Sequence, residues 1–260
     1  MNSVPTDSSL LSLPSPLPTG AATRRSWRAL PGCGEALGLA RLRTTHTGFW
    51  LIIVPSVARA DSLEAELRFF LGTEAGLAVF PDTEVLPYDT FSPHQDLTSR
   101  RLMVLRDVAA GRISTLIVAA STLLPRLAPA RYIGGYSISL AAGQKMRPEQ
   151  LRLQLETAGY QRVAQVMEHG DFAVRGSLLD FYPMGSPQPV RIDFLDDEIE
   201  SLREFDADSQ LSGAVIEALE TLPAREMPVD AEAIKQFRQA YRRRFEGNPA
   251  RSIIYREVSE

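Results

Sequence analysis

Residues 169–185 read HGDFAVRGSLLDFYPMG, and residues 190–198 read VRIDFLDDE. The two segments predict three β-strands that are joined by tight turns. In the last of these strands, apolar residues alternate with Arg191 and Asp193. Because strand side chains point to opposite faces with period two, one face of this strand is predicted to be buried and the other wet. The stretch therefore predicts the antiparallel sheet around which the rest of the chain is interpreted.

Arg175 and Arg191 both alternate away from apolar neighbours on strands that are expected to pair. Guanidinium groups on a sheet surface are suited to binding the carboxylates of another protein. Residue type alone also allows a second interpretation, in which each arginine is solvated or locally paired. Asp193 lies on the face of Arg191 and could pair with it, and an exposed pair of this kind is worth about 0–1 kcal/mol.

The first half of the chain shows the strand–helix alternation that is typical of a parallel α/β sheet. The continuous apolar run over residues 49–54 is expected to form a strand that is buried on both faces. Ser56 is expected to cap the following helix, and Gly72 to end it. Further strands are expected over residues 77–80 and 114–119, with a helix over residues 96–110 between them.

The second half changes character after about residue 125. A strand from Tyr136, a helix from Pro148 to Gly159 and then several antiparallel strands are expected. Asp230 is the expected N-cap of a later helix with one apolar face. The residues on that face are Ile234, Phe237, Tyr241 and Phe245. We divide the chain into a disordered tail over 1–22, an α/β domain over 23–125, a smaller α+β domain over 126–222 and a helical segment over 223–260.

Composition excludes several classes of protein. The net charge of -4 argues against a protein that mainly grips phosphate backbones. Cys33 has no partner for a disulfide, and three scattered histidines (His46, His94, His169) predict no metal site. No apolar run approaches the roughly 20 residues that a membrane span needs. We therefore expect no metal, no membrane contact and a cytoplasmic location.

A nucleotide site is not predicted either. The Gly-rich segment over residues 31–38 is the only candidate for a phosphate-binding loop, and it lacks the lysine and the adjacent Ser or Thr that such a loop requires. We interpret it as a degenerate loop or the start of a helix, so no ATPase activity and no cofactor are expected of this chain.

Two further clusters have structural interpretations that we prefer. His169 lies beside Glu168 and Asp171, but general acid–base catalysis needs a pocket and an oriented base, so His169-Gly170 is expected to form a turn and no catalytic residue is assigned. The basic cluster Arg238 and Arg242–Arg244 is expected to be the solvated face of its helix. Weak contact with DNA or an acidic protein is the alternative.

Several longer motifs resemble one known family. They are LPYDTFSPHQD over residues 86–96, QVMEHG over 165–170, Arg175-Gly176, Pro183-Met-Gly185 and FLDDEI over 194–199. In this order they are similar to the N-terminal, UvrB-like region of the bacterial transcription-repair coupling factors, and the resemblance extends over about residues 45–258. It implies an incomplete, helicase-lobe-like parallel-sheet domain followed by a smaller α+β domain with an antiparallel sheet. It also implies that the helical segment over residues 223–260 returns to the first domain.

The resemblance also implies a role in partner binding. In the family, two arginines and an aromatic residue on the sheet bind UvrA, and these positions fall on Arg175, Arg191 and Leu195. Leucine in the aromatic position is a departure, and the alternative for Leu195 is a core residue beside the turn. The family protein is an ATP-dependent DNA translocase whose ATPase motifs, RNA polymerase contacts and DNA contacts lie in downstream domains.

The family resemblance leaves two other roles open. One is a UvrB-like DNA-binding or helicase lobe, against which the missing lysine and the negative charge weigh. The other is autoinhibition, in which a second domain of the same protein masks the UvrA-binding surface. We expect a non-catalytic module that recruits UvrA to stalled RNA polymerase in transcription-coupled nucleotide excision repair.

Overall fold

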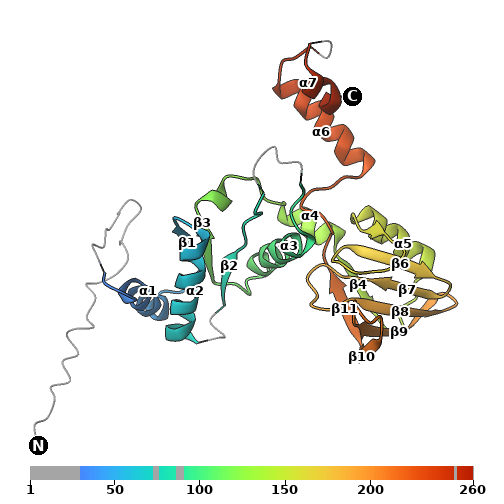
Figure 1. Ribbon diagram of the computed structural model, residues 1–260, viewed down its shortest axis with the longest axis horizontal. Coiled ribbons are helices and arrows are strands. Elements are labelled where there is room, and N and C mark those ends of the chain that lie inside the picture. Colours follow the sequence, from blue (N-terminus) through green and yellow to red (C-terminus); the bar gives the residue numbers. More distant parts are fainter. Residues whose placement is uncertain (1–29, 73–75, 86–90, 249–250, 260) are drawn as a thin grey trace, which may run out of the picture. The chain divides into compact units, whose positions relative to one another are not determined.

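The computed structural model describes residues 30–72, 76–85, 91–248 and 251–259 (Figure 1). The predicted tail over residues 1–22 and the first half of the LPYDTFSPHQD motif lie outside these residues. The described chain is mixed α/β, with one parallel sheet and two sheets that are wholly or largely antiparallel, as the sequence predicted. It divides into two compact units, residues 1–80 with 111–124 and residues 81–110 with 125–260.

The first unit contains a three-stranded parallel sheet in the order β1-β3-β2. Ser56 caps α2 by accepting a hydrogen bond from the Arg59 amide, and Gly72 ends it at φ 86°. The side chains of Leu63 and Leu67 on α2 pack on one face of the sheet. The elements of this unit are α1 (Gly34–Thr45), β1 (Trp50–Val54), α2 (Val57–Leu71), β2 (Leu77–Phe80), β3 (Thr115–Ala119) and a 3₁₀ helix, η2 (Ser121–Leu123).

The prediction that the first strand is buried on both faces is wrong. β1 is an edge strand, and its residues Leu51 and Ile53 are 49% and 56% exposed, whereas Val54 is buried. Only the central strand β3 is buried along its whole length. A continuous apolar run therefore did not distinguish a central strand from an edge strand that is covered on one side.

The second unit is built around a six-stranded sheet in the order β10-β9-β8-β7-β6-β5 and a two-stranded ribbon, β11-β4. Helix α5 lies along one face of the large sheet, where Leu151 and Leu155 join its apolar core (Figure 1). The strands are β4 (Ile138–Ala141), β5 (Gln161–Arg162), β6 (Asp171–Arg175), β7 (Leu178–Phe181), β8 (Val190–Leu195), β9 (Glu198–Phe205), β10 (Ser212–Ile216) and β11 (Ala218–Thr221). The helices are α3 (Gln95–Ala109), α4 (Ala130–Tyr136), α5 (Pro148–Thr157), α6 (Ala231–Arg244) and α7 (Ile253–Ser259).

Helix α3 belongs to a different unit from the one that the predicted domain boundary at residue 125 implied. The sequence assigned residues 81–110 to the first domain, but they belong to the second compact unit. Leu102 is fully buried in the core that α4, α5 and the large sheet share. Packing of the helix, rather than its place in the chain, decides this grouping.

Helix α6 begins as predicted. The Asp230 carboxylate accepts a hydrogen bond from the Ala233 amide at 3.0 Å and one from the Tyr136 hydroxyl at 2.6 Å. These bonds, that from Tyr136 first, lower the pKa of Asp230 below its ordinary value. Among the described residues, none of the helices is long and apolar enough to cross a membrane.

Candidate docking face

One face of the six-stranded sheet carries all three residues that the sequence selected for partner binding. Strand pairing aligns Ala173, Asp180, Arg191 and Arg203 in one row across β6, β7, β8 and β9. The neighbouring row aligns Arg175, Leu178, Asp193 and Ser201. Their strand neighbours Phe172, Leu179 and Ile192 point into the core on the opposite side. We call the face with the two rows, together with Leu195, the polar face.

The polar face is covered at one end and open at the other. At the covered end, Val166 from the segment between β5 and β6 packs against Ala173 and Phe205. At the open end lie Arg175 and Leu195, both exposed. Neighbouring strands are about 4.8 Å apart, so Arg175 lies roughly 10 Å from Asp193 across the sheet. Leu195 is two residues further along β8, which places it roughly 12 Å from Arg175. The sheet therefore gathers residues that are 20 positions apart in the sequence.

Arg175 ends β6 and keeps most of its hydrogen-bonding capacity. Within the described part of the chain, its guanidinium makes one hydrogen bond, of 3.0 Å, from Nη2 to the backbone oxygen of Ala164. A guanidinium group has five N–H donors, so this bond fixes the direction of the side chain and leaves donors available for a carboxylate. Gly176 follows at φ 64° and forms the tight turn into β7.

Leu195 is 61% exposed at the end of β8. Phe194 beside it is buried in the core, so Leu195 points to the polar face. Asp196 follows at φ 54°, a left-handed conformation that Asp tolerates better than most residues. The interpretation of Leu195 as a core residue beside the turn is therefore wrong, and the side chain is available for an apolar contact.

Arg191 has a different environment, because its guanidinium is already bound within the domain. Its Nε and Nη2 donate to the two carboxylate oxygens of Asp180 at 2.7 and 2.9 Å. Its Nη1 donates to Ser212 Oγ at 3.1 Å, and the group lies 5.0 Å from the centre of the Phe205 ring. The hydrogen bonds with Asp180 raise the pKa of Arg191 above its ordinary value. Arg191 is thus a fixed part of the sheet with few donors left.

The partner of Arg191 is not the one that the sequence suggested. Asp193 does lie on the same face, but its carboxylate accepts a hydrogen bond from Ser201 at 3.1 Å. Asp180 pairs directly opposite Arg191 on the neighbouring strand and is only 3% exposed. The alternation along β7 could have placed Asp180 on the polar face. Its pairing with Arg191 could be known only from the register between β7 and β8.

Sequence reasoning also missed Arg203. It lies directly opposite Arg191 on β9, is exposed, and makes no side-chain hydrogen bond or ion pair with any residue that the structure describes. Two positive groups side by side repel each other, and the buried carboxylate of Asp180 offsets this repulsion. The polar face therefore presents two exposed arginines, Arg175 and Arg203, on either side of a neutralised one.

The residues that suggested catalysis have structural roles. His169 Nδ1 lies 2.6 Å from Asp96 Oδ1, its Nε2 lies 2.8 Å from the Ser186 oxygen, and its ring stacks on Tyr182. Asp171 instead accepts hydrogen bonds from the Met167 and Glu168 amides. The predicted turn at His169-Gly170 is confirmed, with Gly170 at φ 85°.

Three of the sequence motifs lie in contact around the start of α3. They are LPYDTFSPHQD, QVMEHG and Pro183-Met-Gly185. Helix α3 supplies Asp96, which binds His169, and Ser99, whose hydroxyl accepts a hydrogen bond of 2.8 Å from the Gly185 amide. Further along α3, the buried Arg101 binds both carboxylate oxygens of Glu226 and the backbone oxygen of Pro81. We call this set of contacts the α3 joint. The motifs at this place hold the domain together.

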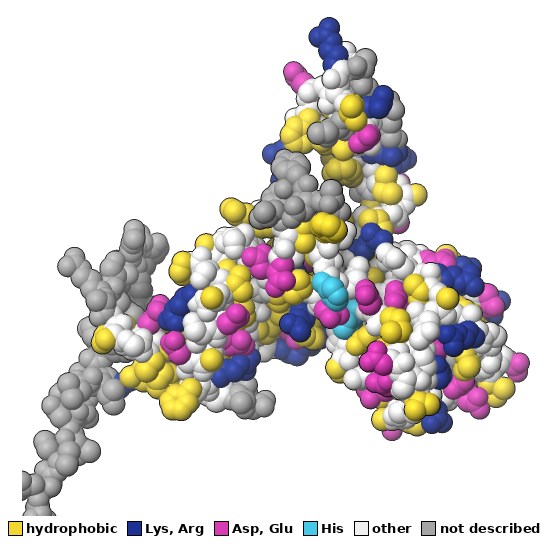
Figure 2. All heavy atoms as spheres, viewed as in Figure 1, with side chains coloured by type: hydrophobic (Ala, Val, Ile, Leu, Met, Phe, Trp, Pro, Cys, Tyr) yellow, Lys and Arg dark blue, Asp and Glu magenta, His cyan; other side chains and the backbone are white. Residues whose placement is uncertain are grey.

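The remaining candidates stay unassigned. The Gly-rich segment over residues 31–38 contains the start of α1 at Gly34, which agrees with the interpretation as a helix start. Over the described ranges, no group of three or more His, Cys, Asp or Glu side chains is arranged to hold a metal ion. Arg242, Arg243 and Arg244 are exposed on α6. Figure 2 shows basic and acidic side chains interspersed over the visible surface.

Comparison with known proteins agrees with this architecture. A family model described as the UvrB interaction domain matches residues 138–227. The chain is 42% identical over 244 residues to the transcription-repair-coupling factor of Escherichia coli (strain K12), covering 94% of this chain and 21% of that protein. It is 39% identical to the factor of Haemophilus influenzae, covering 89% of this chain and 20% of the relative. For Myxococcus xanthus the identity is 32%, with 80% and 18% covered.

The fold and the family model together define residues 138–227 of the second unit as a UvrB interaction domain. With relatives at this level of identity along nearly all of its length, the chain belongs to the family of the transcription-repair-coupling factors. The resemblance that the motifs predicted is thereby confirmed. The chain spans about a fifth of the length of the curated relatives it matches.

Proposed function

We propose that this chain is the non-catalytic docking module of a transcription-repair-coupling factor and that its polar face binds UvrA. The observation that supports this most directly is the pair of exposed side chains at the open end of that face, Arg175 and Leu195. Arginine with unused donors beside an apolar group is a combination that recurs at the centres of protein interfaces. In this proposal, UvrA contributes carboxylates that the arginines bind.

The three candidate residues have different tasks in the proposed interface. Arg175 binds a carboxylate directly, and Leu195 excludes water from an apolar contact beside it. Arg191 acts mainly by position, because with Asp180 it forms a rigid, neutral centre for the face. Its Nη1 donates both to Ser212 and, at 3.5 Å, to the Gln210 oxygen, so only its remaining Nη2 proton is available to a partner. The proposed binding therefore depends on Arg191 through the shape of the sheet as well as through contact.

The role of the complete protein is part of the same proposal. Docking of UvrA would connect stalled RNA polymerase to nucleotide excision repair in the cytoplasm, with the translocase activity and the contacts to polymerase and DNA in the part of the relatives that this chain does not cover. Another domain of such a longer protein could cover the polar face and thereby regulate it. The resulting competition between UvrA and that domain follows from their use of one surface.

The test is direct binding of purified UvrA to this chain, measured by calorimetry or surface plasmon resonance. We expect Kd on the order of 1 μM or tighter. Arg175→Ala and Leu195→Asp are each expected to weaken binding by roughly tenfold or more, which corresponds to about 1.4 kcal/mol. Circular dichroism of each variant establishes that the fold is retained.

Arg152→Ala provides a matched control. Arg152 lies on α5, which covers the opposite face of the sheet, and it pairs with Glu156 at 2.8 Å. This variant is expected to bind UvrA as the wild type does. If the folded wild type does not bind, or if the polar-face variants bind as well as the control, the proposal is wrong. Salt-sensitive DNA binding by the same chain would instead favour the UvrB-like DNA-binding alternative.

A further inference from the structure

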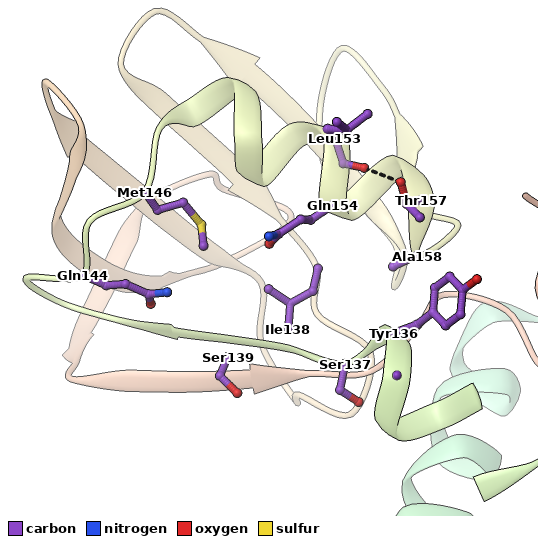
Figure 3. Close-up of a pocket in the computed structure, with 11 residues that line it drawn as sticks. Tyr136, Ser137, Ile138, Ser139, Gln144, Met146, Leu153, Gln154, Thr157 and Ala158 are labelled. Atoms are coloured by element: carbon purple, nitrogen blue, oxygen red, sulfur yellow. Dashed lines mark hydrogen bonds between the residues drawn. The ribbon is translucent and has the colours of Figure 1, made fainter. Parts of the chain in front are cut away.

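A groove lies on the α5 side of the second unit, between that helix and strand β4 (Figure 3). Its volume is about 690 Å³. In Figure 3, Ile138 and Met146 point into it, and Gln154 reaches toward it from α5. The lining residues are Gly135, Tyr136, Ser137, Ile138, Ser139, Gln144, Met146, Leu153, Gln154, Thr157 and Ala158.

One edge of β4 is unpaired where it borders this groove. The register couples Ser139 to Glu220 and Ala141 to Ala218, while the Ala142 amide donates to the Glu217 oxygen. In an antiparallel pair, bonded and non-bonded residue pairs alternate. Ser139 therefore belongs to a non-bonded pair, and its backbone N–H and C=O both point away from β11.

At Ala141, the next residue that faces this edge, the backbone groups do have hydrogen-bond partners. The Ala141 amide donates to Gln144 Oε1 at 3.0 Å, and its carbonyl accepts from the Gln144 amide at 3.1 Å. Gln144 thus takes the place of a neighbouring strand at Ala141. At Ser139 nothing in the described chain does so, and the backbone groups remain available.

The chemistry of the groove selects the kind of strand that would fit. Its floor is apolar, with Ile138, Met146 and Ala158 all buried. None of the lining residues carries a charge. The side-chain amide of Gln154 has no hydrogen-bond partner among the described residues and can bind a peptide group. A charged segment would lose its hydration here without gaining a counter-ion, so a neutral segment is favoured.

Protein sheets usually protect such edges with Lys, Pro, a bulge or a covering element. Strand β4 reads ISLA, and its register with β11 is regular. On the groove side Gln144 covers this edge at Ala141, and none of these devices protects it at Ser139. An unprotected edge beside an uncharged groove is the arrangement by which domains bind an extended peptide as an additional strand.

We propose that β4 binds an extended, uncharged segment of a partner protein, which pairs with Ser139 and places apolar side chains on Ile138 and Met146. This peptide site lies on the α5 side of the sheet, opposite the polar face, so it is independent of UvrA docking. The peptide backbone supplies most of the affinity, and the neutral floor supplies the selectivity.

The proposal is tested by titrating the ¹⁵N-labelled chain with a terminally blocked peptide of about six alternating Val and Thr residues. The Ser139 amide resonance is expected to shift and to saturate, with Kd on the order of 1 mM or tighter. A peptide with Asp in place of two Val residues is expected to bind roughly tenfold more weakly. The absence of a saturable shift at Ser139 overturns the proposal.

Two variants separate backbone pairing from other causes. Ser139→Pro removes the edge N–H and is expected to weaken binding at least tenfold, whereas Ser139→Ala keeps the N–H and is expected to bind as the wild type does. Methylation of the peptide amide that faces Ser139 makes the same test without changing the protein. Equal binding in these cases, or shifts that depend on the concentration of the chain alone and so indicate a second copy at the edge, overturns the proposal.

Discussion

The α3 joint and the open end of the polar face use similar residues in opposite ways. In the joint, Arg101 is fully buried and binds Glu226 and the Pro81 carbonyl. On the polar face, Arg175 is exposed and makes one bond to a backbone oxygen. Both lie in or beside motifs that the sequence singled out. The difference teaches that a motif residue whose donors are satisfied internally maintains the fold, and one with donors to spare is the candidate for binding.

The largest expected effect is at the joint. Arg101→Met removes the cation that binds Glu226 and the hydrogen bond that this guanidinium donates to the Pro81 carbonyl. Breaking a buried ion pair from one side is expected to lower the free energy of unfolding by about 3–5 kcal/mol. Urea denaturation measures this loss. Arg100→Ala, one position earlier and exposed, is expected to change stability by less than about 0.5 kcal/mol, and similar losses in both variants would contradict the comparison.

The effect of Arg191 on the free energy of unfolding shows whether this residue of the polar face mainly stabilises the fold. Arg191→Ala leaves the Asp180 carboxylate, 3% exposed, without its cation. We expect the free energy of unfolding to fall by about 3 kcal/mol, which is near the lower end of the range for breaking a buried ion pair. Arg203→Ala, directly opposite on β9, is the control and should leave the unfolding midpoint nearly unchanged. The double variant Asp180→Ala/Arg191→Ala should recover part of the loss, and an additive result would show that the pair is not coupled.

A smaller effect is expected at the other end of the joint. His169→Ala removes two contacts with acceptor oxygens, on Asp96 and Ser186, together with the stacking on Tyr182. The expected loss is about 1–3 kcal/mol. Because His46 is half-buried and its ring contacts only Thr45 and Leu42 at the end of its own helix, His46→Ala serves as the control. Hydrogen exchange of α3 amides should accelerate in the first variant only, and unchanged protection would argue against a joint.

The smallest effect on stability is expected at Arg175. Arg175→Ala removes an exposed side chain with one bond to Ala164, so the free energy of unfolding should change by less than about 0.5 kcal/mol. The same variant is the one expected to weaken UvrA binding roughly tenfold. Loss of binding without loss of stability distinguishes a docking residue from a structural one. A large loss of stability in Arg175→Ala would show that Arg175 is a structural residue.

The elements themselves were largely predictable. Local signals fixed the helix caps at Ser56 and Asp230, and the turn at Gly170 required a residue that accepts positive φ. Period-two alternation placed Arg175 and Arg191 on strands with their apolar neighbours inside, and the family pattern selected Leu195. The assignment of these three residues to a UvrA interface stays a prediction, since it rests on the family pattern.

What the sequence could not supply is pairing between distant segments. The Asp180–Arg191 pair requires the register of β7 against β8, and the binding of His169 to Asp96 joins residues 73 positions apart. The exposure of Leu51 and Ile53 likewise depends on the place of β1 at the edge of its sheet. None of these follows from the composition or periodicity of a single segment.

The sequence by itself therefore determined the order and type of the elements, the wet and buried sides of strand β8 in the large sheet, and the family to which the chain belongs. Only the tertiary structure decided which charged groups are neutralised and which are free. The physical reason is that alternation along a strand is a local property, whereas satisfaction of a guanidinium or a carboxylate depends on the groups that strand register and helix packing bring to it. Arg175 and Arg191 share one pattern in the sequence, and the carboxylate of Asp180 separates them.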